Sequence, residues 1–265
     1  MRNAELATRT ETIERPAGLA PRALPPALRA SALSHRYADG RPALEGVSFD
    51  LEPGACVAIV GPNGAGKTTL FLRLCGVLNG KPGQASVGGL DPAIPEHRKK
   101  LPEVVGVVFQ NPDDQLFSPT VAEDVAFGPL NMGHPPGEVR ARVADALGAV
   151  GLSGAGERVP FQLSGGEKRR AALAGVLAMR PAVLLLDEPS MFLDPRSRRE
   201  LIGLVRDLPG TKLIATHDLD LVLDTCPRVL VLDAGRIAAD GPAEKLLADP
   251  ELMERHGLEV PYRLR

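Results

Sequence analysis

Four short apolar runs, each followed directly by polar residues, dominate the hydrophobic pattern of this chain. They lie at residues 56–60, 104–109, 182–186 and 212–216. Runs of this length, rich in Val, Leu and Ile, are typical of strands buried on both faces of a parallel sheet. Segments with helical spacing alternate with them, including residues 70–74 and a helix that begins at Pro195. This alternation predicts an α/β fold.

The segments outside this pattern differ in kind. Residues 32–37 and 44–51 predict two strands around a turn, and residues 228–239 predict a hairpin. Ordered structure should begin near Ser31, because residues 1–30 contain five Arg and four Pro and show little periodicity. We therefore expect residues 1–30 to form a flexible tail.

A helical segment interrupts the α/β pattern. Thr120 and Glu123 have the spacing of a capping box at a helix start, and further helices are expected at residues 137–150 and 168–179. We therefore expect one domain with a helical insertion. The predicted layout over residues 31–265 is an α/β core at 31–118 and 175–265 and a helical subdomain at 119–174.

Composition and charge narrow the function classes. The net charge is −2 and aromatic residues make up 3%, so neither a basic field nor base-stacking platforms favour a nucleic-acid partner. No window approaches the roughly 18 apolar residues of a membrane-spanning helix. The five His lack metal-ligand spacing, and the three Cys are expected to be buried free thiols.

The turn after the first apolar run has the spacing of a phosphate-binding loop. Residues 61–69 read Gly-Pro-Asn-Gly-Ala-Gly-Lys-Thr-Thr, before a helix expected to end near Asn79-Gly80. The glycines let backbone N–H groups point at an anion, and the helix N-terminus adds partial positive charge. Lys67 is expected to reach the β- and γ-phosphates, and Thr68 to offer its hydroxyl to Mg²⁺. The candidate nucleotide-binding residues here are Asn63, Gly64, Gly66, Lys67, Thr68 and Thr69.

The other strand ends carry groups that hydrolysis of a nucleotide would need. Asp187 fits the carboxylate that holds Mg²⁺, and Glu188 fits a general base acting on the attacking water. Gln110 is expected at the Mg²⁺ or the attacking water, and His217 as a donor to the γ-phosphate. We expect these groups to converge, because ligands bind at the carboxyl ends of strands in open α/β sheets.

A second glycine turn opens a helix further along the chain. Residues 163–167 read Leu-Ser-Gly-Gly-Glu, directly before the helix predicted at residues 168–179. A helix N-terminus with Ser and two Gly is another potential anion site. These residues alone do not say whose phosphate it would bind.

Taken in order, these motifs are similar to those of the nucleotide-binding subunits of ABC transporters. The order is G-P-N-G-A-G-K-T-T, F-Q, L-S-G-G-E, V-L-L-L-D-E-P and T-H, and the similarity covers residues 31–260. It implies a RecA-like P-loop NTPase core sheet with an N-terminal antiparallel β region and an inserted α-helical subdomain. It also implies a head-to-tail pair of ATPase subunits, in which Ser164 and Gly166 contact the γ-phosphate bound by the other subunit. Tyr37 falls where the family has an aromatic residue that stacks on adenine.

Within this family the sequence resembles the energy-coupling-factor ATPases, and among them those of cobalt and nickel importers. The resemblance rests on residues 108–117 and 120–131. It implies hydrolysis of ATP with Mg²⁺ at the cytoplasmic face of the membrane, by two identical or paralogous ATPase subunits. Their partners would be a transmembrane coupling protein and a separate membrane subunit that binds the metal. Residues 113–121 are expected to face the coupling protein.

Two departures and two alternatives accompany this resemblance. The smaller departure is Glu167, which stands where the fifth residue of the L-S-G-G-E motif is commonly Gln. Met191 and Phe192 are bulkier than the family's usual residues in the loop after the strand-end acids, which bears on the geometry of Asp194. A vitamin importer with the same coupling mechanism is the alternative to a metal importer. A non-transport ABC ATPase acting on DNA or ribosomes is disfavoured, because the stretch between Gln110 and Ser164 is too short for the insertions of those proteins.

Overall fold

The computed structural model describes residues 25–265, and the first strands form a small antiparallel sheet. Its order is β2-β1-β4, with β1 (Leu28–Arg36), β2 (Pro42–Leu51) and β4 (Ala85–Val87). The first strand begins earlier than the predicted start near Ser31, because Leu28 is already paired and fully buried. Residues 1–24 of the predicted tail lie outside the described residues.

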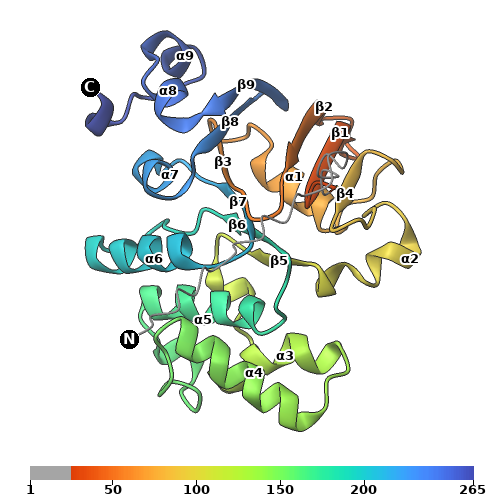
Figure 1. The fold of residues 1–265 in the computed structure, drawn as a ribbon, viewed down its shortest axis with the longest axis vertical. Coiled ribbons are helices and arrows are strands. Elements are labelled where there is room, and N and C mark those ends of the chain that lie inside the picture. Colours follow the sequence, from red (N-terminus) through yellow and green to blue (C-terminus); the bar gives the residue numbers. More distant parts are fainter. Residues whose placement is uncertain (1–24) are drawn as a thin grey trace, which may run out of the picture.

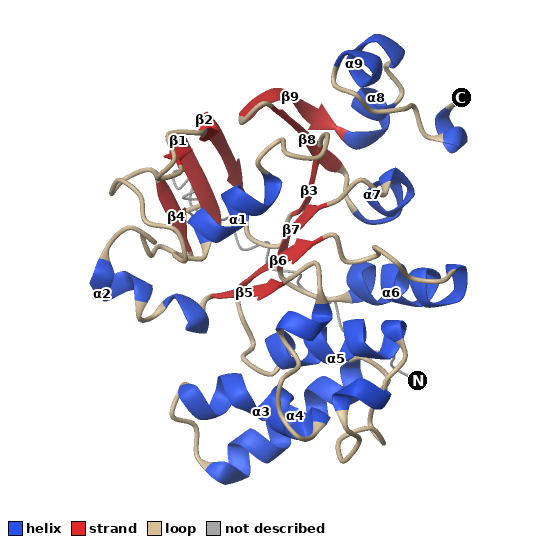
Figure 2. Cartoon of the chain, turned by 180° about the vertical axis from the view of Figure 1, so that it is seen from behind, coloured by secondary structure: helices blue, strands red, loops and turns tan. Residues whose placement is uncertain are grey.

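A six-stranded sheet forms the centre of the molecule (Figure 2). Its order is β5-β6-β7-β3-β8-β9, and all neighbours are parallel except β8 and β9. The strands are β3 (Cys56–Val60), β5 (Val105–Val108), β6 (Val183–Asp187), β7 (Thr211–Ala215), β8 (Arg228–Asp233) and β9 (Arg236–Pro242). All four apolar runs of the sequence are thus parallel strands whose carboxyl ends lie at one edge.

Helices cover both faces of this sheet, with α1 on one side and α6 and α7 on the other (Figure 1). The helices of the core are α1 (Lys67–Leu74), α2 (Pro95–Arg98), α6 (Pro195–Asp207), α7 (Leu219–Thr225), α8 (Ala243–Leu247) and α9 (Pro250–Arg255). The predicted end of α1 near Asn79-Gly80 is wrong. The helix stops at Leu74 because Gly76, with φ +78°, turns the chain out of the helix.

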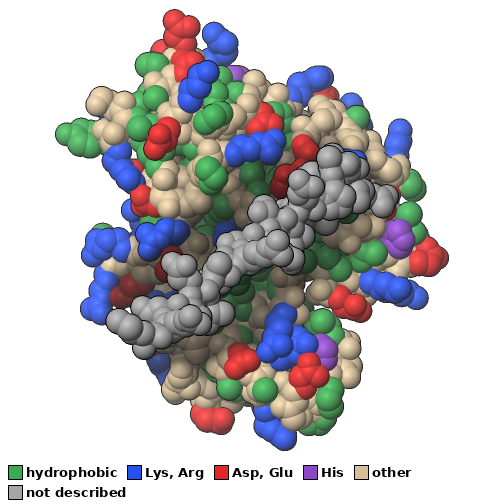
Figure 3. Space-filling view, viewed as in Figure 1, with side chains coloured by type: hydrophobic (Ala, Val, Ile, Leu, Met, Phe, Trp, Pro, Cys, Tyr) green, Lys and Arg blue, Asp and Glu red, His purple; other side chains and the backbone are tan. Residues whose placement is uncertain are grey.

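The amphipathic pattern of α6 shows how these helices attach to the sheet. Leu201 and Ile202 are buried against the strands, whereas Arg196 and Arg199 are exposed. Lys and Arg side chains accordingly gather over α6 at the left of the space-filling view (Figure 3). Burying one apolar face of a helix while its polar face stays in water is the usual source of its attachment.

The helical insertion contains α3 (Val121–Asn131), α4 (Pro136–Ala149) and α5 (Gly165–Leu177). Thr120 and Glu123 form the predicted capping box, each side chain accepting from the other's backbone N–H. α5 begins earlier than predicted and continues past residue 174, the predicted subdomain boundary, to pack on β5 and α6. This helix therefore joins the insertion to the core. Short 3₁₀ turns lie at Leu101–Glu103, Pro112–Asp114, Pro160–Gln162 and Tyr262–Leu264.

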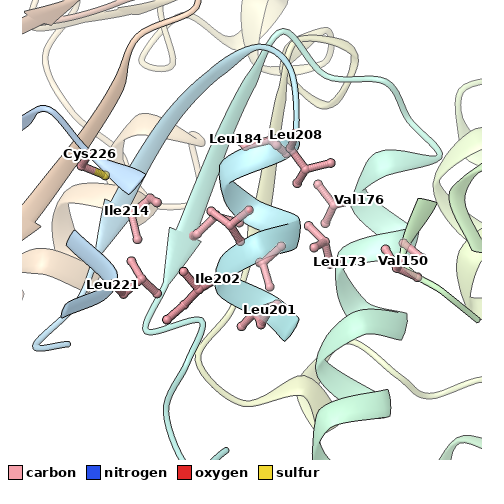
Figure 4. Packing of buried hydrophobic residues seen from close by; sticks show 14 of the residues in the cluster. Val150, Leu173, Val176, Leu184, Leu201, Ile202, Leu208, Ile214, Leu221 and Cys226 are labelled. Atoms are coloured by element: carbon pink, nitrogen blue, oxygen red, sulfur yellow. The ribbon is translucent and has the colours of Figure 1, made fainter. Parts of the chain in front are cut away.

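The buried core has one cluster on each face of the six-stranded sheet. Because side chains alternate along a strand, Ala58 and Val60 join the cluster under α5, α6 and α7, part of which is drawn in Figure 4. Val57 and Ile59 join the cluster under α1 and the small sheet. The three cysteines are free thiols, as expected, but only Cys226 is buried, and Cys56 and Cys75 are half-buried. None of the helices within residues 25–265 has the length and apolar character needed to cross a bilayer.

Candidate active site

The carboxyl ends of β3, β5, β6 and β7 surround one pocket of about 700 Å³ at the edge of the sheet. Side chains and backbone from segments far apart in the sequence line it. They include Tyr37, Arg41, residues 61–69, Gln110, Asp187, Glu188, Met191, His217, Gly257 and Leu258. The strand-end groups singled out in the sequence therefore meet in one place.

The phosphate loop connects β3 directly to α1. Gly61 passes so close to β8 that a Cβ on it would lie 1.9 Å from the Leu232 carbonyl oxygen, and Gly66 has φ +109°. Lys67 is buried, and its Nζ donates to the carbonyl oxygens of Gly61 at 2.7 Å and Pro62 at 3.2 Å. Burial lowers the pKa of Lys67, although the Glu188 and Asp187 carboxylates oppose this. The ammonium thus braces the loop from within while lining the pocket.

Thr68 and Asp187 bring two oxygens together at the base of the pocket. The Thr68 hydroxyl donates to Asp187 Oδ2 at 2.9 Å. Burial raises the pKa of Asp187, since the charged form is desolvated, while the bond from Thr68 opposes the shift. Hydroxyl and carboxylate oxygens are ligands that Mg²⁺ accepts. Within residues 25–265 no group of three or more His, Cys, Asp or Glu side chains is placed to hold a metal, so Mg²⁺ here would also need phosphate or water oxygens.

Glu188 and His217 form a second pair, on the neighbouring strand ends β6 and β7. Glu188 Oε2 accepts from the His217 backbone N–H at 3.1 Å and lies 2.8 Å from His217 Nδ1. The Glu188 backbone has φ +46°, an uncommon value for a side-chain-bearing residue, and its N–H donates to the Ala215 carbonyl oxygen at 2.8 Å. The Glu188 carboxylate is thus held in a fixed position in the pocket lining.

Gln110 lines the pocket, but its amide is engaged by the loop after β6. Its Nε2 lies 2.8 Å from Met191 Sδ. Arg169 of α5, which is almost fully buried, donates to the carbonyl oxygens of Phe109, Gln110 and Met191. Sequence reasoning missed Arg169, because nothing in its spacing marks which arginine of α5 turns inward. It ties the Gln110 and Met191 loops to the helical insertion.

Tyr37 lies at the other end of the pocket, beside the small sheet. Its hydroxyl is 2.9 Å from Thr69 Oγ1, which attaches the ring to the first turn of α1. The Arg41 guanidinium carbon lies 5.4 Å from the ring centroid, and His35 packs edge-on against the ring at 4.9 Å. An aromatic face lining the pocket here can stack on a nucleobase.

Ser164 and Gly166 do not line this pocket, and their expected contact with another subunit's γ-phosphate stays a prediction. Ser164 is exposed, and its hydroxyl accepts from the Glu167 N–H at 3.3 Å. Glu167 in turn accepts from the Ser164 N–H at 2.8 Å and from Arg158 at 2.6 Å. Gly166 is buried because α6 approaches it, and a Cβ there would lie 2.6 Å from Ser197 Oγ.

The loop after Glu188 accommodates its bulky residues by sending one of them outward. Phe192 has φ +63° and is 88% exposed. Asp194 is unaffected by its bulky neighbours, because its Oδ1 caps α6 by accepting from the N–H groups of Arg196 and Ser197. Phe192 therefore presents a large apolar surface to solvent, while Met191 lines the pocket.

The sheet topology and the pocket together define the class of protein to which this chain belongs. A phosphate loop ends the central strand, a carboxylate on a nearby strand bonds its Thr, and a second acid stands beside them. This is the arrangement of a P-loop nucleoside triphosphatase. Residues 44–191 match the family model described as ABC transporter. The chain belongs to the ATP-binding subunits of ABC transporters, and it is an ATPase.

Individual relatives narrow the type. A putative ABC transporter ATP-binding protein of Gloeobacter violaceus is 53% identical, over 88% of this chain and 96% of the relative. The energy-coupling factor transporter ATP-binding protein EcfA of Methanothermobacter thermautotrophicus is 47% identical, over 86% and 75%. CbiO1 of Clostridium perfringens, described as part of the ABC transporter complex CbiONQ, has a TM-score of 0.76 at 38% identity, over 87% and 94%. The ABC ATPase is thus of the energy-coupling-factor type, and the predicted fold class is confirmed.

Proposed function

We propose that this chain powers an importer that takes up cobalt or nickel ions. Two copies, or one copy and a paralogue, would hydrolyse ATP and drive a transmembrane coupling protein, while a separate membrane subunit binds the ion. The metal cargo is supported by the resemblance of residues 108–131 to cobalt and nickel importer ATPases, and by the similarity to CbiO1. The chain would work as a peripheral protein on the cytoplasmic face of the membrane.

The positions of the site residues support the following roles. Asn63, Gly64, Gly66, Lys67 and Thr69 would bind the phosphates through backbone N–H groups, the Lys67 ammonium and the helix N-terminus. Thr68, Asp187 and Gln110 would hold Mg²⁺, which supplies charge neutralisation to the β- and γ-phosphate oxygens when it is bound.

Hydrolysis would depend on the Glu188–His217 pair. Glu188 would take the proton of the attacking water, and its contact with the His217 backbone fixes the carboxylate in place. His217, whose side chain is 55% exposed, would donate to the γ-phosphate. Tyr37 would stack on the adenine.

The observation that supports a membrane partner is a groove beside Gln110. It has a volume of about 590 Å³ and is lined by the residues that follow Gln110 and by α3 and α5. Phe117 and Phe127 meet edge-on at 5.0 Å on its wall and are 63% and 52% exposed. Exposed aromatic pairs of this kind mark contact surfaces.

The floor of the groove contains an acid with spare bonding capacity. Asp124 is 6% exposed, and its Oδ1 accepts from the N–H groups of Phe117 and Ser118. Its Oδ2 has no hydrogen-bond partner among residues 25–265. Apolar walls over a buried carboxylate suit a helix that carries apolar residues and one basic residue. A coupling protein seated here would press on the segment that leads to Gln110.

Reconstitution tests this proposal. The chain, co-expressed with the membrane proteins encoded beside its gene, should purify as one detergent-dependent complex. In proteoliposomes the complex should take up Co²⁺ or Ni²⁺ only with ATP on the side of this subunit, and Glu188→Gln should abolish uptake. Uptake of a vitamin in place of the ions would overturn the metal assignment. ATPase activity that is stimulated by nucleic acid and independent of membrane proteins would overturn the importer.

A further inference from the structure

The C-terminal segment after α9 reaches back to the phosphate loop. Gly257 and Leu258 line the same pocket as Lys67 and Glu188, although they are nearly two hundred residues from the loop. A Cβ on Gly257 would lie 3.9 Å from Pro62 Cβ, at ordinary contact distance. No motif of the sequence pointed to this segment, and the proposed roles of the site residues do not use it.

The position of this segment is fixed by bonds rather than by chance proximity. After α9 the chain reverses at Gly257, with φ +64°, and the Leu258 N–H donates to the Met253 carbonyl oxygen at 2.8 Å. His256 Nδ1 lies 2.8 Å from Asp233 Oδ2, and the His256 side chain is 15% exposed. Asp233 ends β8, the direct neighbour of the phosphate-loop strand β3.

That anchor places the segment against a rigid part of the site. Leu232, next to Asp233, is the residue against which Gly61 packs so closely. The adjoining Gly235 N–H donates to the Ala65 carbonyl oxygen of the phosphate loop at 3.0 Å. In Figure 1, α8, α9 and the C-terminus lie beyond β8 and β9, while β1 and β2 lie on the other side of the loop. The C-terminal segment and the strand β1, which leads into Tyr37, thus lie on different sides of the loop.

We propose that Leu258 is a nucleotide-positioning residue that packs on the base or ribose of bound ATP, held there by the His256–Asp233 pair. The chemistry of Leu258 decides which part of the nucleotide it can contact. Its side chain offers only carbon atoms, so it can exclude water from the base and ribose but cannot bind phosphate. The proposal rests on the nucleotide site assigned above.

Comparing two ligands separates this role from a general effect on folding. Binding of ATP and of inorganic tripolyphosphate, which lacks base and ribose, is measured by calorimetry in the full chain. Leu258→Ala should weaken ATP binding about three- to tenfold, the share expected for a partly buried aliphatic side chain, and leave tripolyphosphate binding unchanged. Leu258→Met should restore ATP binding.

Val260 provides the matched control. It lies in the same segment and, like Leu258, packs against the core, but it does not line the pocket. Val260→Ala should therefore leave both affinities unchanged. ATP binding by Leu258→Ala equal to wild type, or an equal loss for both ligands, would overturn the proposal. Failure of the wild-type chain to bind either ligand would instead overturn the nucleotide site itself.

A second measurement keeps the proposal testable should Leu258→Ala fold poorly. Arg255 is exposed and immediately precedes His256, so trypsin cleavage there reports on release of the segment. ATP should slow this cleavage in the wild-type chain, and tripolyphosphate should not. His256→Ala should accelerate cleavage and weaken ATP binding alone. Equal protection by both ligands would show that the segment senses the phosphate loop and not the base.

Discussion

Two glycine-containing turns of this protein, the phosphate loop before α1 and the turn at residues 164–166 at the start of α5, differ in whether a side chain caps the helix N-terminus. In the part of the chain that the structure describes, no side chain caps the first turn of α1, and that turn contains no Asp or Glu. At α5 the first turn is closed by a capping box between Ser164 and Glu167. A bare N-terminus attracts an anion, whereas a self-capped one has already satisfied part of its donors.

The glycines of the two turns also serve different purposes. Gly61 and Gly66 allow close backbone approach, since a Cβ on either would overlap a carbonyl oxygen, of Leu232 and Ala43 respectively. In the α5 turn Gly165 faces open space, and Gly166 makes room for the Ser197 side chain of α6 rather than for a backbone carbonyl. The phosphate loop is therefore already formed in the isolated chain, whereas the role proposed for the α5 turn depends on a second subunit. Glycine turns before a helix thus form a phosphate-binding loop at α1 but only a capped helix start at α5.

The largest effect should come from removing the base on the phosphate-loop side. Glu188→Gln keeps the shape of the side chain but removes its proton-accepting charge, so steady-state hydrolysis should fall about 10²–10⁴-fold. ATP binding should persist and hold two subunits together. Phosphate release measures the hydrolysis rate, and size-exclusion chromatography with ATP measures the association of the two subunits. Glu96→Gln, at an exposed site on α2, should turn over normally; normal turnover by Glu188→Gln would contradict the assignment.

The comparison between the turns is tested most directly by Lys67→Ala against Ser164→Ala. Lys67→Ala should weaken ATP binding by the isolated chain about 10–100-fold, the worth of charge-assisted hydrogen bonds to the phosphates. Ser164→Ala should leave that affinity unchanged, because Ser164 lies outside its own chain's pocket. The rate of ATP hydrolysis by the Ser164→Ala variant should fall at protein concentrations at which two subunits associate. A loss of monomer affinity in Ser164→Ala would break the distinction.

A pair of glycine substitutions sharpens the same contrast through stability. Gly61→Ala places a Cβ 1.9 Å from a carbonyl oxygen and should lower the free energy of unfolding by about 1–3 kcal/mol. Gly165→Ala, inside the first turn of α5 and facing open space, should raise it by up to about 1 kcal/mol. Urea denaturation compares them. Equal effects at the two positions would contradict the difference between cradle and cap.

The smallest effect concerns the charge that caps α5. The Arg158 guanidinium and the Ser164 N–H lower the pKa of Glu167 from 4.5 to about 2. A carboxyl with a lowered pKa in the folded state stabilises the fold above its unfolded pKa, and this is lost as the pH falls from about 4.5 towards about 2. Because the pair is partly solvent-exposed, we expect about 1 kcal/mol at neutral pH. The stability difference between wild type and Glu167→Gln should therefore shrink over this pH range in denaturant titrations, and a constant difference would exclude the cap.

Much of the site could be predicted because its parts sit where strands end. A buried strand is a short apolar run, and in parallel sheets all such runs deliver their next residues to one edge. Gln110, Asp187, Glu188 and His217 were found by this rule, and Lys67 and Thr68 by the spacing of the phosphate loop that follows a strand. The end of α1 was mispredicted because Gly76, rather than Asn79-Gly80, adopts the left-handed turn.

What the sequence determined by itself was local or periodic: the strands, the phosphate loop, the capping box at Thr120 and the order of the motifs. Only the tertiary structure decided which distant groups meet. Three features depend on packing between elements far apart in the chain. They are the contacts of Arg169 with two loops, the carboxylate oxygen of Asp124 left unpaired in its groove within residues 25–265, and the return of Leu258 to the phosphate loop. Such contacts leave no periodic pattern, because each is fixed by one backbone reversal or one helix rotation and not by a repeat of hydrophobic positions.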